Sequence, residues 1–243
     1  MKALIYSYSI NFAKELGIEL IPAGIESYKT SSKDDVFIIL EKASDIGLLI
    51  TENWEIDFLK KIREIRKEII IFTLLTKVAE PEKFMELKEI GINSCISVSE
   101  NIQEVYDELI NSIIRHNIIN TKEKRHFLRV TPAEMDNFQS AIFHKKKGDY
   151  IRGRVLNISM GGFAFLPLSD DSFSYLEVSR VYNPVFLSFH GNNIKTVSTL
   201  VAVRNGVYGF KFDNIENKDR KKLSTYIYEK LEENLNELLK SAT

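Results

Sequence analysis

The spacing of apolar residues changes once along this chain, close to residue 120, and that change limits the fold more than any other feature. Before it, short apolar runs alternate with amphipathic stretches. After it, strand-like runs follow one another closely and are separated by turn residues such as Gly148-Asp149 and Asn205-Gly206. The pattern predicts two domains of different fold class, residues 1–119 and residues 120–243.

The first domain is predicted to be an α/β fold with a doubly wound parallel sheet. Its apolar runs are typical of strands buried on both faces, at Ala3–Tyr6, Ile18–Ile21, Gly47–Thr51, Ile69–Leu75 and Ser94–Val98. Helical spacing separates and follows them, at Ile10–Leu16, Asp34–Ala43, Asp57–Lys67, Pro81–Ile90 and Ile102–Ile118. Successive units of this kind favour a flavodoxin-like or receiver-like (βα)5 arrangement.

The pattern resembles the receiver domain of two-component signalling, but the residues that carry receiver chemistry are missing. Magnesium binding would need clustered carboxylates after the first strand, where the chain has Ser7-Tyr8-Ser9. Thr51 stands where the phosphate-accepting aspartate is expected, and Ser97-Val98-Ser99 stands where a lysine is expected. We therefore expect a degenerate receiver-like domain that is not phosphorylated and that contacts an unidentified protein partner. Trp54 is either a contact residue of that surface or a packed side chain.

The second domain is predicted to be an antiparallel β-barrel followed by a long helix. The strand-like runs are Ser140–His144, Tyr150–Asn157, Gly162–Leu166, Pro184–His190, Thr196–Arg204 and Val207–Phe212. Alternating aromatic residues, including Phe163, Phe165 and Phe210, are expected to fill the barrel. A helix from about residue 218 to residue 240 carries an apolar stripe that includes Leu223 and Leu231. The stripe either packs on the chain itself or forms the seam of a homodimer.

A basic motif stands at the junction of the two predicted domains. Arg125 and Arg129 carry planar guanidinium forks, which pair with phosphate or with the O6 and N7 edge of guanine. Lys124 adds a further positive charge beside them. Taken alone, the motif is compatible with an anion site or with a solvated hinge.

A second motif combines small polar side chains with paired glycines. In a strand, Asn157 and Ser159 point the same way, so their polar groups can meet one planar ligand. Gly161 and Gly162 lack side chains, so a ligand can approach the backbone there, or the chain can turn. A hairpin that binds nothing would use similar residues.

Together, the two motifs resemble the signature of the PilZ domain, a small β-barrel that recognises the bacterial messenger cyclic di-GMP. The family's Arg-x-x-x-Arg is matched by Arg125 and Arg129, and its (Asp/Asn)-x-Ser-x-x-Gly is matched by Asn157, Ser159 and Gly162. The resemblance implies that the arginines hold phosphates and guanine edges, that the amide and hydroxyl bind a guanine, and that the glycines leave room for it. The implied function is a cyclic di-GMP receptor or adaptor that changes its inter-domain arrangement on ligand binding and so controls a protein partner. The alternative is a PilZ-like adaptor that does not bind nucleotide.

Charge is divided unevenly between the two halves of the chain. Residues 1–119 contain 14 Lys/Arg against 20 Asp/Glu, and residues 120–243 contain 19 against 14, although the net charge is only −1. A basic second half leaves an RNA- or DNA-binding barrel as a further alternative. Because the resemblance implies one small dinucleotide, no DNA or RNA partner is expected.

An enzyme is the function class that the residues support least. The four histidines form no ligand-spaced pair, and no nucleophile–base set is present, so neither catalytic nor metal-binding residues are predicted. No cofactor is expected apart from the ligand cyclic di-GMP. The single cysteine, Cys95, excludes an internal disulfide and fits a reducing compartment. No apolar run is long enough to span a membrane, so the expected location is the cytoplasm.

Overall fold

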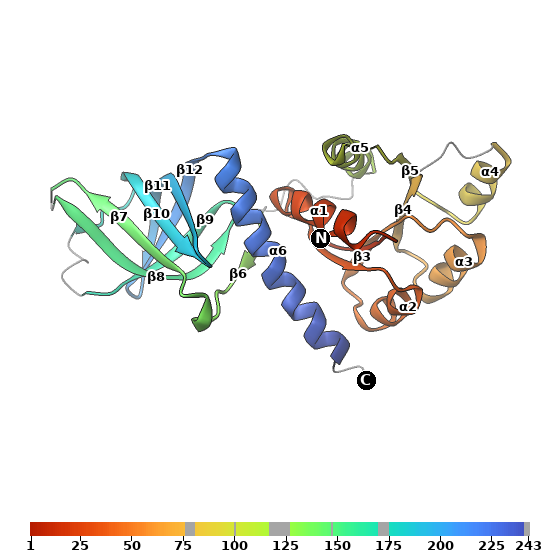
Figure 1. The fold of residues 1–243 in the computed structure, drawn as a ribbon, viewed down its shortest axis with the longest axis horizontal. Helices are drawn as coiled ribbons and strands as arrows, with labels where there is room; N and C mark the ends of the chain where they lie inside the picture. The colour runs from red at the N-terminus through yellow and green to blue at the C-terminus, as the bar shows by residue number, and fades with distance from the viewer. Residues whose placement is uncertain (76–80, 100, 117–126, 147, 170–174, 241–243) are drawn as a thin grey trace. The chain divides into compact units, whose positions relative to one another are not determined.

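The computed structural model describes residues 1–75, 81–99, 101–116, 127–146, 148–169 and 175–240. The chain separates into two compact units, of which one comprises residues 1–126 with residues 231–243 and the other comprises residues 127–230 (Figure 1). Each unit has its own sheet.

The first unit is built on a five-stranded parallel sheet in the order β2-β1-β3-β4-β5. Its strands are β1 (Lys2–Tyr6), β2 (Glu26–Thr30), β3 (Ile46–Thr51), β4 (Ile70–Leu75) and β5 (Ser94–Ser97). Its helices are α1 (Ile10–Leu20), α2 (Lys33–Lys42), α3 (Ile56–Ile65), α4 (Pro81–Glu89) and α5 (Ile102–Arg115). The predicted doubly wound α/β fold is confirmed.

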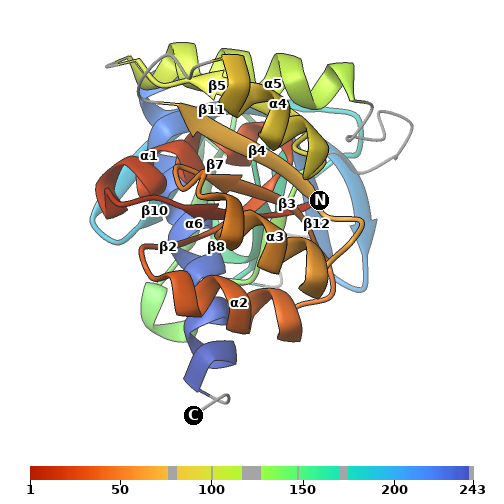
Figure 2. The same ribbon diagram turned by 90° about the vertical axis from the view of Figure 1, so that its right-hand side faces the viewer.

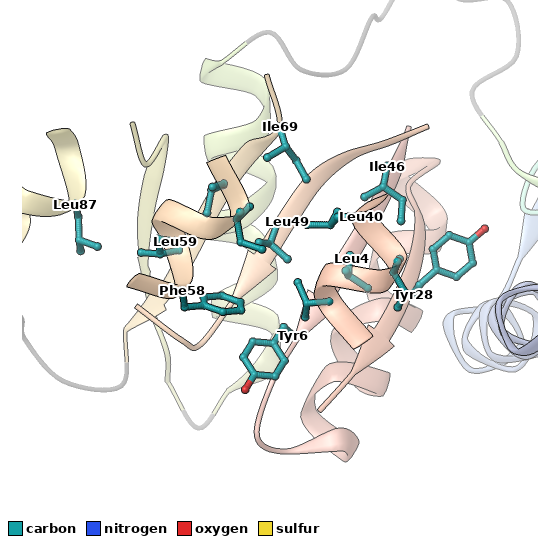
Figure 3. Packing of buried hydrophobic residues seen from close by; sticks show 14 residues of the cluster. Leu4, Tyr6, Tyr28, Leu40, Ile46, Leu49, Phe58, Leu59, Ile69 and Leu87 are labelled. Carbon is teal, nitrogen blue, oxygen red and sulfur yellow. The ribbon is translucent and has the colours of Figure 1, made fainter. Parts of the chain in front are cut away.

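Two apolar layers cover the two faces of this sheet. Helices α1 and α5 contribute Leu16 and Leu109 to one layer, and helices α2 and α3 contribute Leu40 and Leu59 to the other (Figure 2). Figure 3 shows the second layer, in which the ring of Phe58 packs beside side chains of the central strands. Because the strands are covered on both sides, their sequences are nearly continuous apolar runs.

The strand predicted at Ile18–Ile21 is wrong. These residues end α1 and begin a short 3-10 turn, and the second strand is β2, whose sequence is largely polar. Ile18, Leu20 and Ile21 are all buried, and Leu20 belongs to the apolar layer that α1 shares with α5, so this end of the helix is as apolar in sequence as a buried strand. Strand β2 lies at the edge of the sheet, where apolar residues are not needed on every position.

The second unit is an antiparallel barrel, as predicted. Its strands are β7 (Gln139–His144), β8 (Asp149–Ser159), β9 (Gly162–Pro167), β10 (Val181–Phe189), β11 (Asn192–Arg204) and β12 (Val207–Ile215). They follow the order β8-β7-β10-β11-β12-β9, and β9 pairs back with β8, which closes the barrel. A two-residue strand that the sequence did not predict, β6 (Arg129–Val130), pairs with the end of β8. The aromatic residues expected in the core are buried, at Phe163, Phe165, Tyr208, Phe210 and Phe212.

Helix α6 (Asn217–Lys240) follows the barrel and confirms the predicted long helix. Its side chains Leu223 and Ile227 are fully buried. Among the described residues, no helix combines the length and the apolar character that crossing a membrane requires.

A buried carboxylate joins α6 to the barrel. Asp136 lies in a 3-10 turn between β6 and β7, and its Oδ2 atom accepts hydrogen bonds from the Tyr226 hydroxyl at 2.7 Å and the Ala133 N–H at 2.8 Å. Its Oδ1 atom lies 2.9 Å from Nε2 of His190 and 2.9 Å from Nζ of Lys230. This cluster connects three separate segments of the unit through one acidic side chain.

Candidate functional site

Strand β8 contains a bulge that decides which way its polar residues point. Up to Val155, alternate residues of β8 are buried in the barrel, but the pairing with β9 then shifts by one residue between Val155 and Asn157. Beyond the shift, Ile158 is the fully buried residue. Asn157 and Ser159, which flank it, therefore lie together on the outer side of the strand, where Asn157 is half-buried and Ser159 is only 4% exposed.

Strand β6 places the second arginine of the basic motif beside this polar pair. Arg129 is directly opposite Ser159, and Val130 is directly opposite Ile158. Directly opposed residues of antiparallel strands share a face, so Val130 is buried with Ile158 while the exposed Arg129 lies on the side of Ser159. The structure thus brings together residues about 30 positions apart in the chain.

A row of paired residues crosses four strands and leads from Arg129 to a second cation, Lys211. Ser159 pairs with Gly162 of β9, and Gly162 pairs with Lys211 of β12. With strands about 4.8 Å apart, the row runs for about 14 Å from Arg129 at one end to the exposed Lys211 at the other.

The surface between these two cations is lined by small residues. The neighbouring row consists of Asn157, Ala164 and Gly209, which oppose one another on β8, β9 and β12. Two of these three residues, Ala164 and Gly209, have no side chain beyond Cβ, so this row adds few projecting atoms to the face between Arg129 and Lys211. A flat face with a cation at each edge and an amide at one side suits a planar anionic ligand.

Ser159 and Gly162 also shape the turn that joins β8 to β9. The Ser159 hydroxyl donates to the Gly162 carbonyl at 3.1 Å and accepts from the Gly161 N–H at 3.3 Å. Gly162 has a φ of 155°, and a Cβ atom there would lie 2.0 Å from the Phe210 carbonyl oxygen. The glycine is thus required by the close approach of β9 and β12, whatever room it also leaves for a ligand.

Gly161 has a different neighbour, the ring of Phe127. A Cβ atom on Gly161 would lie 2.5 Å from Cδ2 of Phe127, so the ring rests directly on this glycine. Phe127 stands two residues before Arg129 and is 41% exposed. The contact holds the start of β6 against the turn and so helps to place the arginine.

Two of the predicted ligand-binding residues, Lys124 and Arg125, lie outside the described residues. The lysines of the turn after β7 are described only in part: Lys145 and Lys146 are exposed, and Lys146 pairs with Glu177 at 3.5 Å. This ion pair is in keeping with a solvated turn.

Residues 123–229 match the family model of the PilZ domain. Residues 123–229 are a PilZ domain. A search of the curated proteins found no match to the chain.

Several solved structures are similar to one half of the chain. The PilZ domain of YcgR from Escherichia coli with c-di-GMP is 14% identical, with 48% of this chain and 98% of that chain covered and a TM-score of 0.40. The chemotaxis protein CheY4 of Vibrio cholerae is 23% identical, with 46% of this chain and 97% of that chain covered and a TM-score of 0.40. The Bacillus subtilis inhibitor of motility MotI/DgrA is 18% identical, with 47% of this chain and 53% of that chain covered and a TM-score of 0.37.

Two residues of the candidate site between Arg129 and Lys211, namely Phe127 and Lys211 itself, were not predicted from the sequence. Phe127 lies inside the basic motif, but only the structure shows that its ring covers Gly161. Lys211 belongs to the last barrel strand, and its place follows from the pairing of that strand with β9. A register across three strands cannot be read from spacing along the chain.

The receiver-like unit uses the polar residues of its sheet edge to fix its own loops. The Glu52 carboxylate accepts the Tyr8 N–H at 2.9 Å, and the Thr51 hydroxyl accepts the Asn53 N–H at 2.9 Å. Burial is the main cause that raises the pKa of Tyr6, at the end of β1, to about 12.

Among the described residues, no cluster of His, Cys, Asp or Glu side chains is arranged to hold a metal ion. Trp54 packs partly buried against the second apolar layer, which fits the packing interpretation.

Proposed function

We propose that the PilZ domain binds cyclic di-GMP on the face between Arg129 and Lys211, and that the chain is a signalling receptor or adaptor rather than an enzyme. The observation that carries this proposal is the register row that sets Arg129 opposite Ser159, with Asn157 on the same side of β8. The arginine pairs with a phosphate or with a guanine edge, and the amide of Asn157 binds the base. Lys211 offers a second positive charge for the other side of a doubly charged ligand.

Lys124 and Arg125 complete the proposed site. In this proposal they approach the ligand from the segment before β6, so that ligand binding changes the arrangement of the two units. A ligand produces such a change only when it binds one arrangement more tightly than the other. The receiver-like unit then presents or withdraws a surface for a protein partner.

The affinity expected of such a site follows from its charged contacts. Hydrogen bonds to charged groups contribute about 1.5–3 kcal/mol each. Four or five of them, together with contacts to the bases, can exceed an association cost of about 4–15 kcal/mol by enough for micromolar binding. Loss of one arginine is therefore expected to weaken binding by about tenfold to a hundredfold.

Isothermal titration calorimetry of the full chain with cyclic di-GMP tests the proposal. Wild type is expected to bind, Arg129→Ala to bind about tenfold to a hundredfold more weakly, and Arg204→Ala to bind as wild type does. Arg204 is a matched control because it is an exposed arginine of the same barrel, at the far end of β11. Absence of binding by wild type would reject the receptor and favour the adaptor that binds no nucleotide.

Small-angle scattering tests the rearrangement separately. The profile of the full chain is expected to change when cyclic di-GMP is added to saturation. An unchanged profile, with binding intact by calorimetry, would remove the change of arrangement from the proposal and leave the binding site standing.

A further inference from the structure

A second face of the barrel has no role in the function proposed above. It is formed by the outer side of β7, β8, β10 and β11, and it uses the first half of β8, before the bulge. One register row of this face consists of Arg152, Ala141, Phe186 and Lys195. The next row consists of Arg154, Gln139, Ser188 and Asn193.

Aromatic rings stand on this outer side, where an antiparallel sheet usually presents polar residues. The ring centroid of Tyr150 lies 5.3 Å from that of Phe143 and 5.9 Å from that of Phe186. All three side chains are only half-buried. A depression of about 460 Å³ lies beside the rings, and Tyr150, Phe186, Arg152 and Asn193 are among the residues that line it.

The charge of this face is mostly positive. Its four strands carry Arg152, Arg154, Lys195 and Arg204 against one carboxylate, Asp149. Arg152 and Lys195 are both exposed, and within the described part of the chain neither has a side-chain hydrogen bond or ion pair. They stand at the two ends of one row across four strands, about 14 Å apart.

From these rows we propose that the face binds single-stranded nucleic acid. The rings of Tyr150 and Phe186 offer a surface on which a base can stack, and the two cations at the edges meet phosphates on either side of it. Gln139 and Asn193 present amides to the edge of the base. A small inorganic anion would leave the rings unexplained, and an uncharged apolar partner would leave the cations unexplained.

This proposal departs from the expectation that the chain has no DNA or RNA partner. That expectation followed from the small size of the implied ligand, whereas the pairing of β7, β8 and β10 places cations and aromatic rings on one side of the sheet. The site does not depend on cyclic di-GMP, because Asn157, Ser159 and Gly162 of the PilZ signature lie beyond the bulge of β8.

Fluorescence anisotropy of the full chain with labelled oligothymidylate and oligouridylate of about 15 nucleotides tests this site. Wild type is expected to bind at about 50 mM salt, with a log–log salt slope of about −1.4 if Arg152 and Lys195 each contact one phosphate. Arg152→Ala and Lys195→Ala are each expected to flatten the slope by about 0.7. Tyr150→Leu is expected to weaken binding by about tenfold with the slope unchanged, since stacking carries no charge. The two oligonucleotides show whether DNA or RNA is preferred.

The controls separate this proposal from the cyclic di-GMP site. Lys88→Ala, on α4 of the other unit, and Arg129→Ala should both bind oligonucleotide as wild type does, and far-UV circular dichroism checks that Tyr150→Leu is folded. The proposal is overturned by absence of binding at about 50 mM salt, by equal binding of a duplex, or by unchanged affinity of folded Tyr150→Leu. Displacement of the oligonucleotide by cyclic di-GMP would also overturn it.

Discussion

Replacing Asp136 by asparagine tests whether one buried carboxylate holds α6 on the barrel. The residue is 3% exposed and accepts four donors, which come from Ala133, His190, Tyr226 and Lys230. Asparagine has the same shape, but its amide turns a donor toward groups that are themselves donors. The substitution therefore removes the charge and breaks the cluster without leaving a cavity.

The magnitude follows from the pKa of this carboxyl. Burial opposes ionisation of Asp136, but hydrogen bonds from Tyr226 and Lys230 outweigh it and hold the pKa at about 2, below the ordinary 3.8. A depression of this size corresponds to about 2 kcal/mol of folding free energy. Because the folded-state pKa is lowered, this stability is present above about pH 4 and is lost as the pH falls toward 2. Breaking a buried ion pair costs about 3–5 kcal/mol, so the expected loss for Asp136→Asn at neutral pH is about 2–5 kcal/mol.

The two units give separate signals, which makes the assay selective. Trp54 is the only tryptophan and lies in the first unit, so its fluorescence during urea unfolding should be the same in the variant and in wild type. Hydrogen exchange of the barrel strands and of the first turns of α6 should be faster in the variant by a factor that matches the lost free energy. Asp149→Asn is the matched control, because Asp149 is an exposed aspartate of the same barrel.

Two results would refute the reasoning. One is a decrease of less than about 1 kcal/mol in the free energy of unfolding of the Asp136→Asn barrel. The cluster would then stabilise the barrel no more than an exposed ion pair does. The other is an acid sensitivity between about pH 4 and pH 2 that is the same in the variant and in wild type.

The remaining predictions concern the face proposed to bind cyclic di-GMP. Gly162→Ala should destabilise the barrel by several kcal/mol or prevent folding, since its Cβ would lie 2.0 Å from the Phe210 backbone oxygen; thermal melting measures this, and a wild-type melt would contradict it. Gly161→Ala should melt within about 1 kcal/mol of wild type, because the Phe127 ring can move aside, but should bind cyclic di-GMP several-fold more weakly by calorimetry as β6 shifts. Lys211→Ala should lower that affinity by about tenfold with stability unchanged, and equal affinity would exclude Lys211 from the site.

The two fold classes could be predicted from the sequence because each has its own spacing of apolar residues along the chain. Continuous apolar runs between helical stretches marked the parallel sheet, and closely spaced runs with turn residues marked the barrel. The one wrong strand, Ile18–Ile21, shows where this reasoning fails. A four-residue apolar run has no measurable period, so the buried end of a helix and a buried strand look alike.

The candidate site was predicted less completely, because most of it depends on pairing between distant strands. Spacing along the chain could identify Asn157 and Ser159 as neighbours on one side of a strand. It could not predict β6, which consists of two residues, Arg129 and Val130, and is specified by its partner strand and by the Phe127 ring. Lys211 was missed for the same reason, since its place depends on two successive pairings.

The bulge in β8 shows that the direction of the polar pair is a tertiary property. The buried residues before it are Ile151, Gly153 and Val155, so uninterrupted alternation would turn Asn157 and Ser159 into the barrel and Ile158 out to solvent. One extra residue reverses this, because the strand then opposes two of its residues to one on β9. The bulge therefore turns the amide of Asn157 and the hydroxyl of Ser159 to the outer side of β8, which the proposed site requires. Asn157 is the half-buried member of the pair, whereas Ser159 is only 4% exposed and its hydroxyl bonds within the turn that joins β8 to β9.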